Sequence, residues 1–135
     1  RLDTIQAAIL LEKIKIFPSE LKLRAHHASL YQKKLKSLIK TPEINDNISS
    51  AWAQFTLVVE KRDDLQIHLK QLGIPSVVYY PIPLSKQTGY RNFPIVSSGT
   101  RVSERLSERV LSLPMHPYMT QEIVERVCQA IESFR

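Results

Sequence analysis

The sequence predicts an α+β fold in which long N-terminal helices precede a small, roughly three-stranded sheet covered by helices. Two observations support this. The first 40 of the 135 residues carry apolar side chains at helical spacing almost without interruption. The remaining residues alternate helical patterns with short stretches rich in β-branched and aromatic side chains, as in a sheet packed against helices. We therefore expect a helical connecting segment over residues 1–40 and a small α/β domain over residues 41–135.

The N-terminal segment carries two successive helical patterns. Residues 2–16 place apolar side chains on several sides of a helix, so more than one neighbour must cover them. Pro18 interrupts this pattern, and Ser19 is suited to cap a new helical start. A second apolar stripe runs from Leu21 to about Ile39. The segment is therefore predicted as two long helices, or as one long helix kinked at Pro18.

The remaining elements follow a polar linker at residues 41–50. Strand patterns occur at residues 55–60, 76–80 and 111–113, and helical patterns occur at residues 64–72, 102–110 and 121–131. The stretch 81–100 contains prolines and is expected to be irregular. Thr120 is suited to cap the last helix, and Cys128 is expected at the edge of its apolar face. This order of elements favours a small sheet with helices packed on it.

The charge distribution narrows the function classes. The net charge is +6, but residues 1–40 hold nine basic and three acidic residues, and the rest of the chain is neutral overall. The basic side chains occupy polar positions of the helical pattern, which favours a solvated helix face over a phosphate-binding or partner surface. No zinc-finger or RNP-like pattern accompanies them. We therefore expect no nucleic-acid partner, and a basic nucleic-acid module is a distant third hypothesis.

The cysteine count and the apolar runs indicate the cellular environment for which the chain is suited. The single cysteine, Cys128, excludes an intrachain disulfide and a multi-cysteine zinc site. No apolar run approaches the ~20 residues that a membrane span needs, so no membrane partner is expected. These features are compatible with a cytoplasmic globular protein. Because the chain begins at Arg1 inside a helical pattern, we expect it to be a piece of something longer.

Residue patterns alone give no complete catalytic constellation. Phosphate-binding loops, dinucleotide fingerprints, HExxH motifs and nucleophile elbows are absent from the sequence. The four histidines, His26, His27, His68 and His116, are too scattered in the sequence to predict a metal site. The first three of them are expected at the surface. Two segments are more particular, VYYPIPL at residues 78–84 and LPMHPY at residues 113–118. Each is either a structural element or a rigid platform that presents polar rings to a ligand.

Four motifs together resemble the DegT-type family of PLP-dependent sugar aminotransferases. In the family's order they are RLDTIQAAIL (1–10), SAWAQFTLVV (50–59), GIPSVVYYPIPL (73–84) and VLSLPMHPY (110–118). The likeness covers essentially the whole chain but only the C-terminal third of a family member. It implies the small C-terminal domain of the fold type I PLP aminotransferases. The helix at residues 2–16 would then connect two domains and, in this chain alone, leave an exposed apolar patch prone to self-association.

The resemblance implies the chemistry of the full-length protein. Such enzymes use PLP to move an amino group from glutamate to a keto sugar nucleotide, for surface polysaccharides or amino sugars, and form the active site at a homodimer interface. The Schiff-base lysine lies upstream of Arg1, so the resemblance assigns no catalytic residue and no metal ligand to this chain. We therefore expect neither bound PLP nor activity from this chain alone.

The resemblance assigns substrate contacts to three residues. Arg1 matches the arginine of a loop that crosses to the partner subunit, and a guanidinium suits a carboxylate or a diphosphate. Tyr79 and Tyr80 match a strand-end pair that faces the sugar, where the nearest branch has His-Tyr. Tyr79 keeps a hydrogen-bonding tip but loses a group that titrates near neutrality. Ser85 stands where many members have a histidine, so the role of that histidine does not carry over.

Two further expectations remain open. His116 and Tyr118 match the family's MHPY loop, which we take as mainly structural, with substrate contact as the alternative. The main rival to enzyme function is a non-enzymatic regulatory or interaction domain that reuses the small-domain fold, because some DegT-type proteins carry regulatory labels. An upstream reading frame with a lysine motif would favour the enzyme, whereas a start codon directly before Arg1 would favour the rival.

Overall fold

A long helix and a two-stranded antiparallel sheet organise the chain. A computed structural model describes residues 2–134. Its elements are α1 (Thr4–Leu35), β1 (Phe55–Val58), α2 (Arg62–Gln71), the 3₁₀ helix η1 (Leu84–Lys86), α3 (Arg101–Ser107), β2 (Val110–Leu113) and α4 (Gln121–Glu132). This order confirms the predicted α+β class, although the sheet has two strands where about three were expected.

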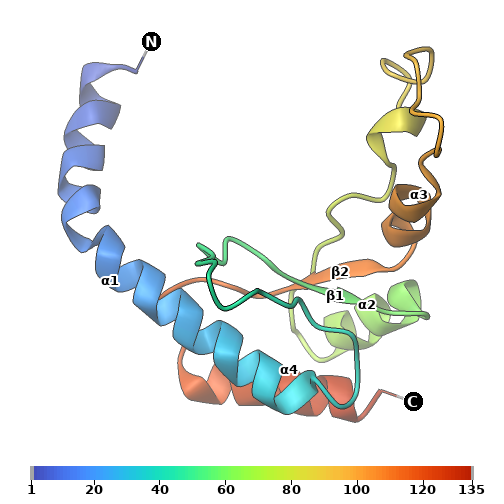
Figure 1. Cartoon of the computed structure of the whole chain (residues 1–135). Coiled ribbons are helices and arrows are strands. Elements are labelled where there is room, and N and C mark those ends of the chain that lie inside the picture. Colours follow the sequence, from blue (N-terminus) through green and yellow to red (C-terminus); the bar gives the residue numbers. More distant parts are fainter. Residues whose placement is uncertain (1, 135) are drawn as a thin grey trace.

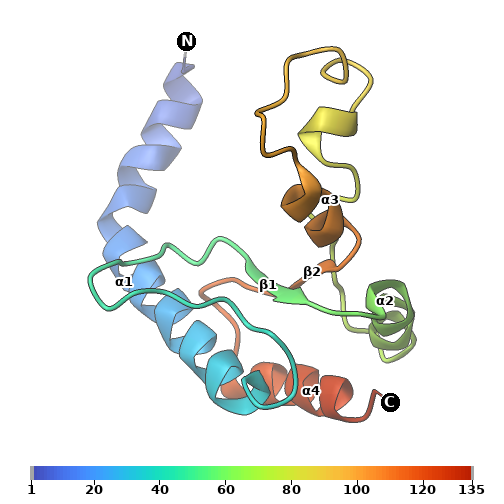
Figure 2. The same cartoon turned by 45° about the vertical axis from the view of Figure 1, so that its right-hand side comes forward.

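The elements form a packed base with two projecting arms. The C-terminal half of α1 packs on α4, and α4 packs on α2, so these helices cover one side of the sheet. The N-terminal half of α1 and the segment of residues 81–107, which includes α3, extend beyond the opposite side (Figures 1 and 2). The two arms stand at the two ends of the sheet, and the space between them faces away from the base.

Helix α1 is a single helix, in agreement with the second of the two alternatives. It begins at Asp3, whose side chain accepts a hydrogen bond from the Gln6 backbone N–H at 2.8 Å, and it continues through Pro18. Its buried residues all lie beyond Pro18 and are His27, Ala28, Tyr31 and Leu35. These positions share one face because they are separated by one, three and four residues. That face is the part of α1 that anchors the helix to the rest of the chain.

The strand predicted at residues 76–80 is wrong. Only Val77 pairs with β2, through reciprocal backbone hydrogen bonds with Ser112 of 3.1 and 2.8 Å. The chain bends at Tyr79, and the flanking residues Pro75 and Pro81 lack the N–H groups that would extend the ladder. Strand β1 is likewise shorter than predicted, and it pairs with β2 from Phe55 opposite Leu113 to Val58 opposite Val110.

The core lies where α1, α4 and the sheet meet. Its largest fully buried side chains include Tyr31, Phe55, Leu57 and Leu111. The Tyr31 ring packs against Phe55, with ring centroids 5.0 Å apart, and Trp52 stacks on the other side of Phe55 at 5.7 Å. Aromatic pairs at these distances stabilise the core beyond the burial of their area.

The exposure predicted for three side chains is wrong, because neighbouring helices cover these side chains. Cys128 is 1% exposed instead of lying at the edge of the apolar face of α4, because α1 packs over that face. His27 is 4% exposed, because it belongs to the buried face of α1. His68 is half-buried, and its Nε2 lies 2.9 Å from the Ala130 carbonyl oxygen at the end of α4. Helical spacing did not indicate these tertiary contacts.

The predicted apolar patch on the N-terminal half of α1 is confirmed. Ile5, Ile9, Leu11 and Ile14 are each more than half exposed, with Ile5 at 75%. Within residues 2–134, no helix is long and apolar enough to cross a membrane. Large apolar side chains exposed together on one helix are uncommon on the surface of a monomer.

The buried thiol and phenol predict a loss of stability at alkaline pH. Burial raises the pKa of Cys128 to about 11 from an ordinary 9.0, and burial also raises the pKa of Tyr31. Because the unfolded chain ionises at the ordinary values, the free energy of unfolding is unaffected below pH ~9 and falls as the pH rises through the folded pKa values. Urea unfolding from about pH 8 to about pH 11 measures this effect.

The variant Cys128→Ala separates the thiol from the phenol. It should lose less stability over that pH range than the unaltered chain, since the contribution of the buried thiol is then removed. Equal pH slopes for the two proteins would contradict the assignment to Cys128.

Candidate substrate-facing site

Tyr79 and Tyr80 lie at the bend where the chain leaves the edge of β2. Their ring centroids are 5.5 Å apart and the ring planes are inclined by 63°, so one ring presents its edge to the other. Tyr79 is 40% exposed and Tyr80 is 68% exposed. The single bridge between Val77 and Ser112 fixes the chain just before them. The pair is therefore presented at the surface from an anchored backbone.

The two tyrosines line a hollow of about 540 Å³ between the 81–100 segment, α3 and the start of β2. Its other walls are mostly apolar, with three polar side chains, and comprise Ile82, Pro83, Leu84, Gln87, Ser103, Leu106, Ser107 and Val110. This volume lies within the range of small-molecule pockets, which combine apolar walls with a few polar groups. The hydroxyls of the two tyrosines and the two serines can each donate or accept a hydrogen bond.

Tyr79 also lines a second, smaller hollow on the other side of the bend. This hollow has a volume of about 250 Å³ and is bounded by Gln54, Ser76, Ser112 and Met115 among others. The Ser112 hydroxyl is engaged with the Thr56 hydroxyl at 2.8 Å. Tyr79 thus separates two hollows, one of which reaches the start of the LPMHPY segment.

A polar network ties the 81–100 segment to α3. The Ser85 hydroxyl donates to the Thr100 hydroxyl at 3.4 Å, and Thr100 donates to Glu104 at 2.8 Å. Lys86 forms an ion pair with Glu104 at 2.9 Å, and this contact, with that of Thr100, lowers the pKa of the Glu104 carboxyl. Ser85 therefore helps to tie the 81–100 segment to α3 beside the tyrosine-lined hollow.

His116 and Tyr118 lie in the loop between β2 and α4, beside the middle of α1. The Tyr118 hydroxyl donates a hydrogen bond to Glu20 of α1, and the Tyr118 backbone N–H donates to His116 Nδ1 at 3.2 Å. Neither residue lines the two hollows at Tyr79. The structure therefore brings Tyr79 and Tyr80 together but not these two residues. Arg1, the remaining expected contact, lies outside the described residues.

The sequence did not reveal which residues of α1 form hydrogen bonds with the loop between β2 and α4. Tyr31 donates from its hydroxyl to the Pro114 carbonyl at 3.0 Å, and His27 Nε2 lies 3.4 Å from the Pro117 carbonyl oxygen. Glu20, His27 and Tyr31 lie on one side of the helix because their spacings are close to whole turns. Helical spacing could have grouped them, but nothing in the sequence pointed to the loop that they bind.

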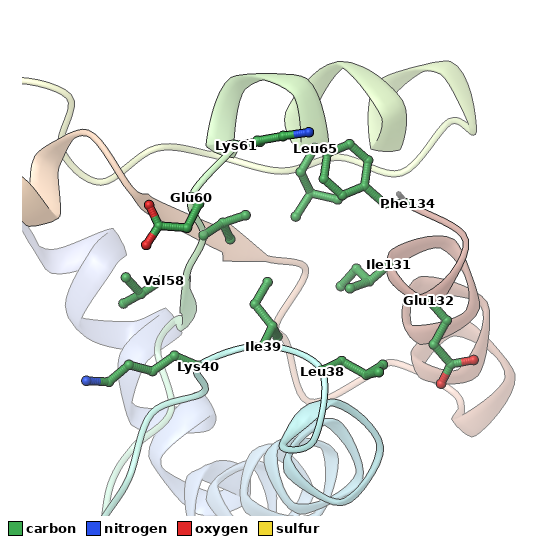
Figure 3. Close-up of a pocket in the computed structure, with 11 residues that line it drawn as sticks. Leu38, Ile39, Lys40, Val58, Glu60, Lys61, Leu65, Ile131, Glu132 and Phe134 are labelled. Atoms are coloured by element: carbon green, nitrogen blue, oxygen red, sulfur yellow. The ribbon is translucent and has the colours of Figure 1, made fainter.

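A further hollow of about 530 Å³ lies on the base, between the end of α1, β1, α2 and α4 (Figure 3). Ile39, Leu65 and Ile131 face its interior, while Lys40 and Glu132 lie at its rim (Figure 3). None of the residues expected to contact substrate lines it. Its lining consists of apolar side chains inside the hollow and charged side chains at the rim.

The chain does not supply a complete PLP site at the tyrosine-lined hollows. Neither hollow has a lysine to bind the cofactor's aldehyde, nor an arginine or lysine to hold its phosphate, among its lining residues. Within residues 2–134, no group of three or more histidine, cysteine, aspartate or glutamate side chains could hold a metal ion. The two hollows present hydroxyl groups on a mostly apolar surface, which suits a polar, neutral ligand.

The sequence and fold of this chain are similar to those of known proteins. A crystal structure of a DegT/DnrJ/EryC1/StrS aminotransferase from Brucella abortus superimposes with a TM-score of 0.97 and 45% sequence identity, over 99% of this chain and 36% of that one. The UDP-2-acetamido-2-deoxy-3-oxo-D-glucuronate aminotransferase of Pseudomonas aeruginosa is 41% identical over 97% of this chain and 36% of its own length. A pleiotropic regulatory protein of Geobacillus stearothermophilus is 34% identical over 99% of this chain and 37% of its own length.

The fold is thus that of part of a sugar aminotransferase. The model of the DegT/DnrJ/EryC1/StrS aminotransferase family matches residues 1–132, and the chain belongs to this family. It spans about 36% of the length of the aminotransferases that it matches. The family membership predicted from the four motifs is confirmed.

The contact between Tyr118 and Glu20 has a measurable signature. The hydrogen bond to the Glu20 carboxylate is the main cause that raises the pKa of Tyr118, since ionised phenolate cannot donate it. Glu20→Ala should therefore lower the pKa of Tyr118 toward the ordinary tyrosine value. A pH titration followed by NMR of ring-labelled tyrosine, with the Tyr118 signal assigned from Tyr118→Phe, measures this shift.

The matched control is Glu12→Ala. Glu12 is also on α1 but pairs with Lys15 at 2.7 Å, away from the loop. The same Tyr118 pKa in both alanine variants would show that Glu20 is not its partner.

Proposed function

We propose that the chain is the C-terminal part of a PLP-dependent aminotransferase that moves an amino group from glutamate to a keto sugar nucleotide. One observation carries the proposal: Tyr79 and Tyr80 stand together on the apolar hollow of a chain that is 41% identical to an aminotransferase of a UDP-linked oxo sugar. The proposed setting is surface polysaccharide or amino-sugar synthesis in the cytoplasm.

In this proposal the chain recognises the sugar. The phenol groups of Tyr79 and Tyr80 hydrogen-bond to sugar hydroxyls, and Ile82, Leu84 and Leu106 exclude water from the same hollow. The Tyr79 hydroxyl, where the nearest family branch has a histidine, can both donate a hydrogen bond to the sugar and accept one from it.

The rest of the site comes from outside these residues in the proposal. PLP belongs to the full-length protein, with the Schiff-base lysine upstream of Arg1. Arg1 reaches the nucleotide from the partner subunit of a homodimer. Residues 1–40 connect the two domains and residues 41–135 form the small domain. The exposed apolar patch on α1 supports this, because such a surface suits burial against a further domain or subunit.

Reduction with borohydride tests whether the chemistry lies outside the chain. We expect the purified chain, incubated with PLP and reduced, to carry no lysine labelled in stoichiometric amount. Absorbance spectra and peptide mapping by mass spectrometry measure the labelling. One lysine labelled stoichiometrically would contradict the proposal and make the chain a self-contained PLP protein.

A chimera tests the function itself. Residues 1–135 would replace the matching segment of the Pseudomonas aeruginosa aminotransferase, and amino transfer from glutamate to its oxo sugar nucleotide would be assayed. We expect activity, and we expect Tyr79→Phe and Tyr80→Phe to reduce kcat/KM by roughly 10-fold each, the effect of one lost hydrogen bond of about 1.4 kcal/mol.

Tyr90→Phe is the matched control, because Tyr90 is an exposed tyrosine outside the larger tyrosine-lined hollow, and it should leave kcat/KM unchanged. A folded, PLP-binding chimera without activity would contradict the enzyme assignment. It would favour the second candidate, a non-enzymatic regulatory domain, which the similarity to the pleiotropic regulatory protein supports.

A further inference from the structure

Pro18 interrupts the backbone hydrogen bonding of α1 at the point where the helix leaves the base. Because proline has no N–H, the Ile14 carbonyl has no helical partner, and kinks concentrate at such positions. Both views show α1 bent within the blue part of the helix (Figures 1 and 2). The large apolar residues before Pro18 are exposed, so core packing does not fix the direction of this half.

Glu20 connects the two sides of this interruption. Only 12% of its side chain is exposed, although the helix around it lies near solvent. Its carboxylate accepts the hydrogen bond from the Tyr118 hydroxyl, and its Oε1 lies 3.7 Å from Lys13 Nζ, two turns earlier and beyond Pro18. Glu20 is thus in contact with the loop after β2 and with the exposed half of α1 at the same time.

The loop that carries Tyr118 is itself fixed to the buried half of α1. The Tyr31 hydroxyl binds the Pro114 carbonyl, and His27 Nε2 faces the Pro117 carbonyl oxygen. Tyr31 is completely buried and His27 nearly so. The backbone of the loop that carries Tyr118 is therefore held against the core on both sides of His116, although the Tyr118 side chain itself is 63% exposed.

We propose that Tyr118 is a positioning residue whose hydrogen bond to Glu20 sets the direction in which residues 4–17 of α1 leave the base. This role differs from the substrate contact considered for the MHPY loop, because the hydroxyl that could bind a substrate is engaged by Glu20. Its consequence for catalysis rests on the proposed function, in which residue Arg1 directly before this half-helix reaches the nucleotide sugar. The contact itself stands on the geometry of this chain.

Distances between spin labels test the proposal in the purified chain. Cysteines at Ala8 and Lys70, both exposed, report the exposed half of α1 against α2. Cysteines at Lys33 and Lys70 report the buried half as a control. Cys128 needs no replacement because its buried thiol does not take the label under native conditions. We expect Tyr118→Phe to broaden the first distance distribution and leave the second unchanged.

Substitutions of Glu20 provide the second arm. Glu20→Gln keeps an acceptor for the Tyr118 hydroxyl but loses the charge that pairs with Lys13, so it should broaden the distribution less than Glu20→Ala, which should broaden it at least as much as Tyr118→Phe. Tyr90→Phe controls for the loss of an exposed tyrosine hydroxyl. If Tyr118→Phe fails to fold, as judged by circular dichroism, the two Glu20 variants decide the question.

Unchanged distributions in Tyr118→Phe and Glu20→Ala would overturn the proposal, as would equal broadening for both label pairs. The measurement needs neither PLP nor substrate. A negative result would therefore leave the proposed function standing, and an inactive chimera would leave this contact standing.

Discussion

The structure depends on the burial of one face of α1 against the sheet and α4. Tyr31 is the centre of this contact: its ring packs on Phe55 of β1, and its hydroxyl binds the carbonyl of Pro114 after β2. One side chain thereby joins the helix, both strands and the loop that leads to α4. A two-stranded sheet is marginal by itself, so it needs a packed helix face of this kind to persist. Ala28 and Leu35 extend the same face and complete the base.

The two arms follow from what this base leaves uncovered. The N-terminal half of α1 and the segment around α3 carry large exposed apolar side chains, because the base is too small to bury them. The chain spans about 36% of the length of its aminotransferase relatives. The tyrosine-lined hollow belongs to one arm and the bend at Pro18 to the other. The candidate site is thus an open hollow on one arm.

The local sequence around Tyr79 and Tyr80 accounts for only part of their position in the fold. Prolines on both sides confine the stretch, and the sequence therefore marked it as unusual. The bridge between Val77 and Ser112 then fixes where the bend lies, and Ser85, Thr100 and Glu104 close the wall beside the hollow. These contacts join residues far apart in the chain, and hydroxyl groups carry no periodic signal. This is why the pair was predictable as a feature while its surroundings were not.

The sequence by itself determined the class of fold, the family and most of the helical segments, because helical spacing and the four motifs are local patterns. The helix predicted over residues 102–110 is shorter, since α3 ends at Ser107 and Val110 begins β2. The sequence also determined that the first half of α1 is apolar beyond what one neighbour could cover. Only the tertiary structure decided that residues 76–80 leave the sheet after one bridge, that His27 and Cys128 are buried, and that Tyr118 binds Glu20. The physical reason is the same in each case: a side chain's burial and hydrogen-bond partner depend on which distant element packs over it, and periodicity records only the face on which it lies.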